Sequence, residues 1–554
     1  MKITLDGKQV ETDGNKTVFQ ICHDNKIQIP TLCYHASLSP EARCRVCLVE
    51  MDGKLVASCA TKPREGSVIT TTNEKITKAR KLNMELMITN PACSREDDFE
   101  VCEIYRQVGI GRARFEGLKN YQPDLGASVV RDNNKCINCG KCVRVCADIQ
   151  GVYAIDFASR AQNEHVSPYG EKPLSEVACI KCGQCILNCP VGAITERSHL
   201  EEVIAALNNK KKTVIAQTAP SIRAALGELF GMEAGTLVTG KMVSSLRKCG
   251  FEKVFDVDLG ADITIMEESA ELMRRLKKGG PFPMITTCCP GWILMMEHFH
   301  HELMPNMSTC KSPHEMLGML IKTYYAQKAG LNPKDIVVVS IMPCTAKKYE
   351  STRPELSSAV DYVLTTRELG RLIKRKGIDF ANLPEDEFDS PLGISTGAGV
   401  IFGATGGVME AALRTSYELA TGKTLTKIEF EQIRGVKGIK EGSIILNGKE
   451  IKFAVAHGGC NIQQLLKVKD NYHFLEMMAC PGGCIGGGGQ PIYSDPDTLR
   501  KRTEAIYRAD AGTPLRKSHE NPAVKKIYEE YLGAPGSQKA ELLLHTHYEK
   551  RSRF

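Results

Sequence analysis

Cysteines in glycine-rich turns are the most informative residues for chemistry in this 554-residue chain. Three such turns occur. Cys480 and Cys484 lie in the last of them, here called the third cysteine turn, LEMMACPGGCIGGGGQP at 475–491. Thiolates at this spacing bind thiophilic metals, and glycines leave clearance because they carry no Cβ. This combination predicts a pocket around a bulky inorganic cluster; the alternative is a glycine-rich turn that merely contains cysteine. The first and second cysteine turns are TTCCPGW at 286–292 and MPCTAKKYE at 342–350.

The strongest local pattern is C-x2-C-x2-C-x3-C, which occurs twice between residues 131 and 200. In bacterial two-cluster ferredoxins with this pattern, the fourth cysteine of each run binds the other run's cluster. The pattern therefore predicts two adjacent [4Fe–4S] clusters that relay electrons. The expected ligands are Cys136, Cys139, Cys142 and Cys189 for one cluster, and Cys179, Cys182, Cys185 and Cys146 for the other.

Four further cysteines near the N-terminus have the spacing C-x10-C-x2-C-x11-C. A long loop that supplies three thiolates, with a fourth from a following strand, suits a [2Fe–2S] cluster. The alternative, a zinc ribbon, needs two C-x2-C pairs, and only one is present. The expected ligands are Cys33, Cys44, Cys47 and Cys59. The stretch resembles the β-grasp domains of plant-type and complex-I-type ferredoxins.

Residues 81–130 hold an incomplete cluster pattern in a charged, helix-like segment. Related multi-cluster enzymes carry H-x3-C-x2-C-x5-C here, around a [4Fe–4S] cluster. In this chain Cys93 and Cys102 match two cysteines, whereas Thr89 and Glu96 occupy the histidine position and the remaining cysteine position. Two thiolates cannot complete a four-iron cluster, so we expect a helical structural bridge without one.

The elements that must position these cysteines change type along the chain. Residues 1–80 predict a small β-rich unit, with a hairpin around an Asp-Gly pair and a helix over 17–25. Residues 131–205 contain the ferredoxin repeat. From 206 to 554, strand-like runs such as DIVVVSIMP alternate with helix-like runs such as SIRAALGELFG and SAELMRRLKK. We therefore expect a multidomain α/β protein with largely parallel sheets and a helical C-terminal tail.

Composition narrows the class and the compartment. The chain has 23 cysteines but is far longer than a small disulfide scaffold. Its N-terminus shows no signal peptide, and no apolar run reaches the roughly 18 residues of a membrane span. We therefore expect reduced, metal-binding thiols and a cytoplasmic location. The excess of 72 Lys and Arg over 65 Asp and Glu is too small to indicate a nucleic-acid surface.

The three cysteine turns resemble the signature motifs of the H-cluster domain of [FeFe]-hydrogenases, and the resemblance spans nearly all of residues 131–550. It implies that the [4Fe–4S] half of an H-cluster is bound by Cys289, Cys344, Cys480 and Cys484. Cys484 would also bridge to a diiron half with carbonyl, cyanide and azadithiolate, and Lys347 would donate to a cyanide. AQTAPSIR matches the family as well, so the expected lining residues are Ala219, Pro220, Ser221, Met342 and Met478. Without the flanking motifs, Lys347 would be interpreted as a surface residue and the methionines as core.

The same resemblance makes Cys288 the last proton carrier before the bridgehead amine. A thiol suits this role because its ordinary pKa of about 8.5 lets it gain and lose a proton near neutrality. Behind it we expect Glu268, Ser308, Glu271 and Arg275. The two glutamates share one face of a predicted helix. For Arg275, four residues beyond Glu271, a simple i,i+4 salt bridge is an equal alternative.

The resemblance implies an enzyme that interconverts protons, electrons and H2. Its electron partner would be ferredoxin or a flavoprotein NADH-oxidising subunit, alone or in a bifurcating or formate-linked complex. Dedicated maturation proteins would build the diiron site. Two alternatives are an H2 sensor and an iron–sulfur electron-transfer subunit of NADH dehydrogenase type. Sensors tend to lose the proton-carrying cysteine, and an electron-transfer subunit would not need the three cysteine turns.

Overall fold

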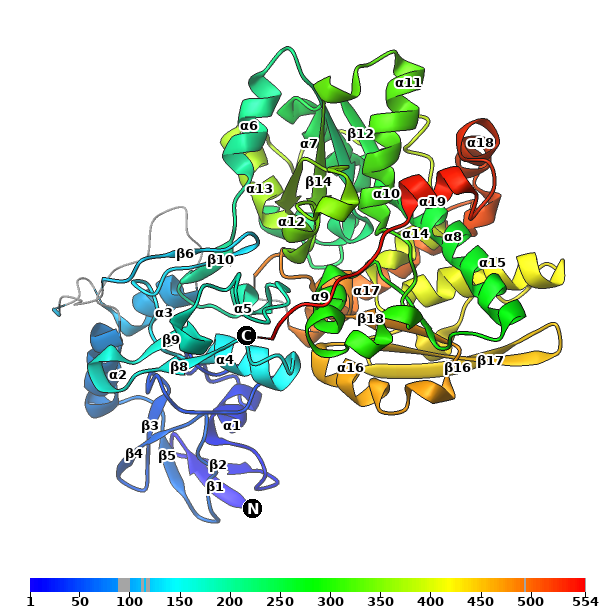
Figure 1. Cartoon of the computed structure of the whole chain (residues 1–554). Helices are drawn as coiled ribbons and strands as arrows, with labels where there is room; N and C mark the ends of the chain where they lie inside the picture. Colours follow the sequence, from blue (N-terminus) through cyan, green and yellow to red (C-terminus); the bar gives the residue numbers. More distant parts are fainter. Residues whose placement is uncertain (88–99, 111–113, 116–119, 493–494, 554) are drawn as a thin grey trace.

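The computed structural model describes residues 1–87, 100–110, 114–115, 120–492 and 495–553. Figure 1 shows the N-terminal units in blue and cyan beside a larger C-terminal part in green to red. The described residues form one five-stranded, two four-stranded, one three-stranded and one two-stranded sheet. None of the helices in these residues has both the length and the apolar character to cross a membrane.

The N-terminal sheet has the strand order β2-β1-β5-β3-β4. Strands β1 and β2 pair antiparallel, and Asp6 and Gly7 between them have the positive φ that such a tight turn requires. Helix α1 follows Thr17, whose side chain forms a capping box with Gln20. The predicted hairpin and helix are thus confirmed. The bounds are β1 Lys2–Leu5, β2 Lys8–Glu11, α1 Val18–Asp24, β3 Leu48–Met51, β4 Lys54–Ala57 and β5 Val68–Thr70.

Two helices, α2 (Glu74–Met87) and α3 (Glu100–Val108), lead to the ferredoxin-like region. The backbone N–H of Val101 donates to the carbonyl of Pro190 at 3.1 Å, which ties α3 to that region. Helix α2 runs across residue 80, where the sequence suggested a boundary. The prediction of a missing cluster falls mainly on residues outside those described, namely Thr89, Cys93 and Glu96.

The ferredoxin-like region repeats one local geometry. Gly140 and Gly183 adopt the left-handed region, with φ of 74° and 70°, directly before the short helices α4 (Lys141–Arg144) and α5 (Gln184–Leu187). A residue with a Cβ would be strained at either position. The two cysteine runs therefore pass through equivalent turns. The strands are β6 Asp124–Leu125, β7 Val129–Arg131, β8 Ile155–Ala158, β9 His165–Pro168 and β10 Ile194–Glu196.

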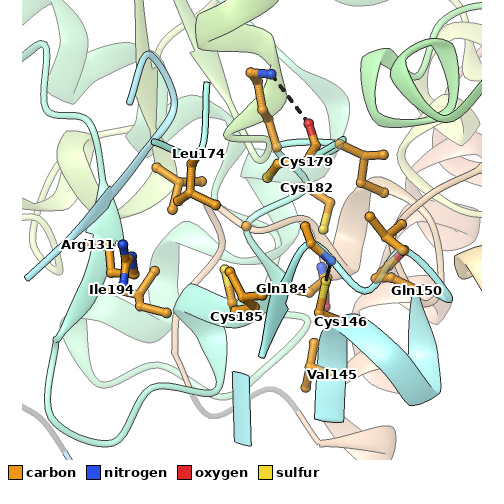
Figure 2. Close-up of a pocket in the computed structure, with 17 residues that line it drawn as sticks. Arg131, Val145, Cys146, Gln150, Leu174, Cys179, Cys182, Gln184, Cys185 and Ile194 are labelled. Carbon is orange, nitrogen blue, oxygen red and sulfur yellow. Dashed lines mark hydrogen bonds between the residues drawn. The ribbon is translucent and has the colours of Figure 1, made fainter. Parts of the chain in front are cut away.

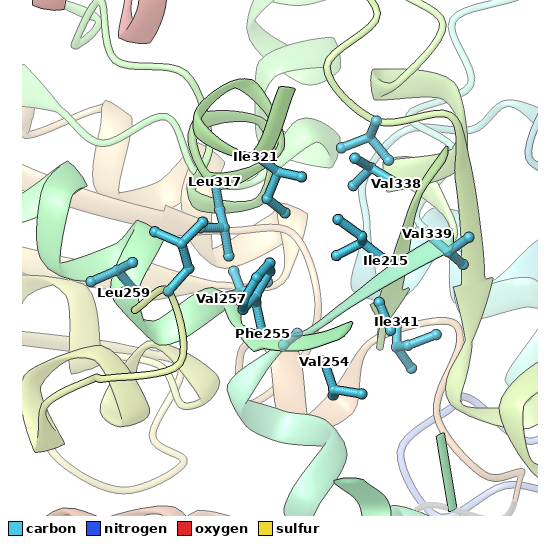
Figure 3. Close-up of a cluster of buried hydrophobic side chains, with 14 of the residues drawn as sticks. Ile215, Val254, Phe255, Val257, Leu259, Leu317, Ile321, Val338, Val339 and Ile341 are labelled. Carbon is cyan, nitrogen blue, oxygen red and sulfur yellow. The ribbon is translucent and has the colours of Figure 1, made fainter. Parts of the chain in front are cut away.

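The first C-terminal sheet is parallel, with the order β12-β11-β14-β15. Its central strands are apolar runs buried on both faces, as is usual for parallel sheets. Figure 3 shows Ile215, Phe255 and Val338 of this sheet near Leu317 of α10, in the largest core. The bounds are α6 Leu200–Asn208, β11 Thr213–Thr218, α7 Thr239–Cys249, β12 Lys253–Asp256, α10 Pro313–Leu320, α11 Ala326–Ala329, β14 Ile336–Met342, α12 Ala346–Glu350, β15 Tyr362–Thr365 and α13 Thr366–Arg375.

The second C-terminal sheet has the order β13-β18-β17-β16. Only β16 among these strands runs antiparallel to its neighbour. Helix α8 contacts both α10 of the first half and α15 of the second, and so joins the two halves. The bounds are α8 Val257–Lys278, β13 Met284–Ile285, α9 Pro290–Phe299, α14 Gly397–Val400, α15 Gly407–Thr421, β16 Ile439–Leu446, β17 Lys449–His457, α16 Gly459–Leu466 and β18 Phe474–Met478.

The C-terminal tail contains α17 (Pro496–Gly512), α18 (Pro522–Ile527) and α19 (Gln538–Leu544). In Figure 1 its last residues, in dark red, leave α19 and cross the molecule past α9. Arg551 pairs with Glu297 of α9, with 2.6 Å between Nε and Oε2. The tail therefore packs along α9 of the C-terminal part.

One predicted helix is wrong. The segment SIRAALGELFG forms two 3₁₀ turns, Pro220–Ala224 and Leu226–Phe230, instead of an α-helix. Ala225 between them has φ −131° and ψ −25°, which is not helical, and Gly231 ends the segment in the left-handed region. The break leaves Pro220 and its neighbours at the carboxyl end of β11.

Candidate metal centre and proton-carrying residues

The three cysteine turns lie at the carboxyl ends of parallel strands from both C-terminal sheets. Cys288 and Cys289 follow β13, Cys344 follows β14, and Cys480 follows β18. Ligands of open α/β sheets bind at such strand ends. The segment that begins at Ala219 follows β11 in the same way. Both sheets therefore contribute to one site.

The four expected cluster ligands, Cys289, Cys344, Cys480 and Cys484, lie close together. Burial raises the pKa of all four thiols, and that of Cys344 reaches about 12. Repulsion between neighbouring thiolates adds to the rise for Cys344, Cys480 and Cys484. Thiols in this environment become thiolates only beside a strong positive charge. The donor set therefore fits a bound metal cluster.

The predicted lining residues surround the same place. Met342 and Met478 are the buried last residues of β14 and β18. Ser221 is fully buried, and its hydroxyl makes no hydrogen bond within the described residues. Buried hydroxyls normally have a partner, so this one supports a bound group at the site. Gln490 Nε2 donates to the carbonyls of both Ser221 and Cys484 at 3.4 Å, which holds the two segments side by side.

Lys347 is buried rather than on the surface. Its Nζ donates to Glu350 Oε2 at 2.7 Å and to the carbonyl of Cys288 at 3.1 Å. His314 Nε2 lies 2.6 Å from the same Glu350 oxygen. Burial opposes the charge on Lys347, but Glu350 outweighs it and raises the pKa. Sequence reasoning missed His314, which lies 36 residues before Glu350 and belongs to no cysteine turn.

The sequence suggested that the glycines beyond Cys484 leave clearance for a cluster. The structure gives them a different role. A Cβ on Gly487 would lie 2.3 Å from the carbonyl oxygen of Pro343, and one on Gly488 would lie 2.3 Å from that of Cys182. Both places are already filled by backbone. These glycines instead allow the second and third cysteine turns and the ferredoxin-like region to pack against one another.

The ferredoxin repeat predicts two groups of four cysteines. In the structure each group combines three cysteines of one run with one cysteine of the other run. Cys146 of the first run lines one cavity with three cysteines of the second run (Figure 2), namely Cys179, Cys182 and Cys185. Burial, followed by repulsion from Cys189, raises the pKa of Cys139 to about 12. Cys189 of the second run therefore lies with the first run, beside Cys136, Cys139 and Cys142.

The N-terminal cysteines converge as well. Cys33 lies within hydrogen-bond distance of Cys44 and Cys59, and Cys47 within that distance of Cys59. Arg144 Nη2 donates to the carbonyl of Cys33 at 2.6 Å and also contacts that of Cys139 at 3.5 Å. One buried guanidinium therefore joins the N-terminal group to the first ferredoxin-like group.

The second ferredoxin-like group adjoins the C-terminal site. Cys480 Sγ lies 4.0 Å from the carbonyl oxygen of Cys182. The side-chain amides of Gln150 and Gln184 donate to carbonyls of the third cysteine turn at 2.9 and 2.8 Å. Sequence reasoning missed both glutamines, although Gln184 stands directly before Cys185. Each glutamine lies more than 300 residues from the carbonyl it contacts, so no local sequence pattern could predict these hydrogen bonds.

The predicted proton carriers lie near one another. Burial raises the pKa of Glu268 to about 8, nearby Glu271 adds to the rise, and a hydrogen bond with Ser308 opposes it. Ser308 Oγ lies 3.3 Å from Glu271 Oε2, and Arg275 Nη2 donates to Glu271 Oε1 at 2.6 Å. Burial raises the pKa of Cys288 well above its usual value, and the charge of Glu268 contributes.

Comparison with known protein families agrees with this arrangement. Residues 212–488 match the model of the iron only hydrogenase large subunit, C-terminal domain, and residues 496–551 match that of the iron hydrogenase small subunit. The chain belongs to the iron-only hydrogenase family. A 2Fe-2S iron–sulfur cluster binding domain matches residues 1–74, and a 4Fe-4S dicluster domain matches residues 135–193. This hydrogenase therefore has a [2Fe–2S] domain and a two-cluster [4Fe–4S] domain before its H-cluster domain.

Individual relatives cover the whole chain. The NADP-reducing hydrogenase subunit HndD of Solidesulfovibrio fructosivorans is 45% identical over 100% of this chain and 99% of its own length. Iron hydrogenase 1 of Clostridium pasteurianum is 40% identical over 99% of this chain and 100% of its own. The solved structure of [FeFe]-hydrogenase HydA1 from Chlamydomonas reinhardtii covers 64% of this chain and 100% of its own, with 42% identity and a TM-score of 0.58. The resemblance inferred from the cysteine turns is confirmed.

Proposed function

We propose that this hydrogenase interconverts protons and H2 at an H-cluster bound by Cys289, Cys344, Cys480 and Cys484, with Cys484 as the bridge to the diiron half. The observation that supports this most strongly is the convergence of the four thiols from three strand ends in two sheets. When bound, the cluster supplies the redox and hydride chemistry. The chain supplies the ligands, the hydrogen-bond donors around them and the path for protons.

The chain offers two buried donors to the site, of which Lys347 is already held by hydrogen bonds. The ammonium of Lys347 is fixed by Glu350 and by the carbonyl of Cys288, so it can donate a charge-assisted hydrogen bond into the site without rearrangement. The hydroxyl of Ser221 is the second donor. Around these donors, apolar groups that exclude water come from Ala219, Pro220, Met342 and Met478.

For protons, we propose the order Glu271, Ser308, Glu268 and Cys288. A carboxyl group with a pKa of about 8 takes up and releases protons near neutral pH. The contacts of Ser308 with both glutamates support its place between them. Arg275 has a positioning role, because it holds Glu271 through its guanidinium.

For electrons, we propose that four cysteine groups would hold the carriers in this order: the N-terminal group, the group of Cys136 with Cys189, the group of Cys146 with Cys179, and the three cysteine turns. The contacts of Arg144 support the first step, and the approach of Cys182 to Cys480 supports the last. The corresponding units are a β-grasp domain (1–80), a helical bridge (81–130), a two-cluster ferredoxin domain (131–205) and the H-cluster domain with its tail (206–554).

We further propose that the chain works as one subunit of a cytoplasmic complex. HndD of Solidesulfovibrio fructosivorans, which this chain matches over its full length, is named as a subunit of an NADP-reducing hydrogenase. A flavoprotein NADH-oxidising subunit, or ferredoxin, would supply or receive the electrons, and maturation proteins would build the diiron half.

The test is infrared spectroscopy and H2 turnover on anaerobically purified protein that was co-produced with maturation proteins. We expect carbonyl and cyanide bands together with turnover in at least one direction. Bands without turnover would instead identify an H2 sensor. Absence of the bands from protein with fully loaded iron–sulfur clusters would exclude the H-cluster assignment.

A further inference from the structure

Arg275 cannot be the group that delivers protons to Glu271. Its Nη2 and Nε donate to Glu271 Oε1 at 2.6 and 3.1 Å. Its remaining contacts go to three carbonyls at 3.3, 3.0 and 2.7 Å, those of Pro281, Asn306 and Met307. A guanidinium keeps its proton at any physiological pH. Arg275 therefore fixes Glu271, and protons must reach this carboxylate through another group.

The second oxygen of Glu271, Oε2, contacts one buried residue and one exposed residue. Glu271 Oε2 lies 3.3 Å from Ser308 Oγ on the inner side. On the outer side it lies 3.2 Å from the backbone N of Thr309 and 3.5 Å from Thr309 Oγ1. Thr309 is exposed, whereas Ser308 is fully buried. The Thr309 hydroxyl is therefore the first group outward from Glu271.

A histidine of the C-terminal tail stands beside this hydroxyl. His545 Nδ1 lies 2.7 Å from Thr309 Oγ1, and 8% of its side chain is exposed. The backbone of Thr546 donates to the carbonyl of Thr309 at 2.7 Å, and Cys310 forms an antiparallel bridge with His545. The tail is thus fixed in register with the residues that follow Ser308.

The other ring nitrogen of His545 is already engaged. His545 Nε2 lies 3.1 Å from Glu267 Oε2. Glu267 is buried and also accepts from Tyr528 OH at 2.6 Å and from the backbone of Gly536 at 2.7 Å. With Nε2 engaged by Glu267, Nδ1 is the nitrogen that faces Thr309 and that can exchange a proton with its hydroxyl.

We propose that His545 and Thr309 form the solvent end of the proton path that leads to Glu271. In the inward direction, Nδ1–H of the imidazolium passes its proton to Thr309 Oγ1 while the Thr309 hydroxyl passes its own to Glu271 Oε2. One proton moves and no electron does; water then reprotonates Nδ1. The charged groups around His545 are Glu267, Glu271 beyond Thr309, and Glu541 on α19, which pairs with Arg274 at 3.3 Å.

The inference rests on the proposed hydrogenase activity, and His545→Gln tests it in the matured holoenzyme. We expect a loss of roughly tenfold in H2 evolution at neutral pH, a larger solvent isotope effect and unchanged carbonyl and cyanide bands. Added imidazole should restore turnover. The matched control is His547→Gln, which changes an exposed histidine two residues further along the same tail and should retain the wild-type rate.

Thr309→Val separates proton transfer from structure, because it removes only the hydroxyl. We expect Thr309→Val to reproduce the loss, Thr309→Ser to restore turnover, and imidazole not to rescue Thr309→Val. A second readout is the titration of His545, followed by NMR on protein with labelled histidine, which should change in Thr309→Val. Wild-type turnover and pH profile in His545→Gln, or a titration of His545 that is the same in Thr309→Val, would overturn the proposal. Loss of turnover in the wild type itself would instead count against the proposed function.

Discussion

At the scale of single residues, burial decides which groups can carry protons. Burial raises the pKa of Cys288, so its thiol holds a proton at neutral pH and can give it up only to a strong local base. Glu268 behind it titrates near pH 8. Ser308 connects it to Glu271, which contacts the surface through Thr309. Burial thus raises the pKa of the two titratable groups nearest the site, Glu268 and Cys288.

Cys288→Ala should remove most turnover, because it removes the thiol that the proposed path places between Glu268 and the site. We expect a loss of about a hundredfold or more. Iron content and the carbonyl and cyanide bands should stay at wild-type levels, since Cys288 is not among the four ligands. The control is Cys460→Ala, which alters a half-buried thiol on α16. Near-normal turnover in Cys288→Ala would refute the relay.

Glu268→Gln should change how stability depends on pH. The folded protein holds the Glu268 proton up to about pH 8, whereas the unfolded chain releases it near 4.5. Folded protein therefore binds more protons in this window, and this residue destabilises the fold increasingly as pH rises from 4.5 to 8, by about 1.4 kcal/mol per unit. Glutamine stays neutral. The melting temperature of Glu268→Gln relative to wild type should increase between pH 5 and pH 9; a constant difference would contradict the assignment.

At the scale of elements, the site depends on turns that pack backbone against backbone. The cysteine turns follow β13, β14 and β18, and each must pass within van der Waals contact of another turn. Gly183 shows the same requirement in the ferredoxin-like region, since a Cβ there would lie 2.4 Å from Thr345 Oγ1 of the second turn. The glycines thus allow the ferredoxin-like region to pack closely against the second and third cysteine turns.

Gly488→Ala should separate the ferredoxin-like region from the third cysteine turn. The new Cβ would lie 2.3 Å from the carbonyl oxygen of Cys182, and backbone cannot move aside at low cost. We expect a lower melting temperature and slower reduction of the C-terminal site through the relay. Gly512→Ala is the control, because nothing lies within 4 Å of its added Cβ. Equal effects of the two variants would disprove this role for the glycine.

The ferredoxin-like cysteine groups were predictable from sequence because the spacing within each run is local, whereas the grouping of the three cysteine turns was predicted from the family resemblance. The hairpin at Asp6 and the helix near Thr17 were predictable from local patterns as well. The segment from Ser221 was not, since its apolar periodicity favours a helix while Ala225 breaks it into two turns. Nor was the contact between Thr309 and His545, which joins positions 236 apart. Such contacts arise from tertiary packing, which no window of sequence contains.

At the scale of the whole molecule, buried polar side chains connect one redox unit to the next. Arg144 spans the first junction, and Gln150 and Gln184 span the last. Polar contacts of this kind cost more to break than they contribute when formed, because each carbonyl would be left buried without a donor. They therefore hold the units in one arrangement.

Arg144→Met should loosen the junction between the [2Fe–2S] domain and the ferredoxin-like region. It leaves the carbonyls of Cys33 and Ser39 without their guanidinium donor, at a cost of roughly 1–3 kcal/mol for each unpaired group. We expect faster proteolysis between the two units and a weaker magnetic interaction of the [2Fe–2S] cluster by EPR. Arg500→Met, at an exposed position of α17, is the control. A proteolysis rate and an EPR spectrum like those of wild type would argue against this role.

The C-terminal tail matches a family model of its own, that of the iron hydrogenase small subunit, over residues 496–551. Its anchors are spread along its length, from Arg502 with Glu228 to His545 with Glu267 and Arg551 with Glu297. A segment held in this way can dock from a separate polypeptide. Joining it to the same chain raises its effective concentration to about the millimolar range. Because the tail belongs to the same chain, its effective concentration does not fall on dilution, and His545 stays at the proposed proton entrance.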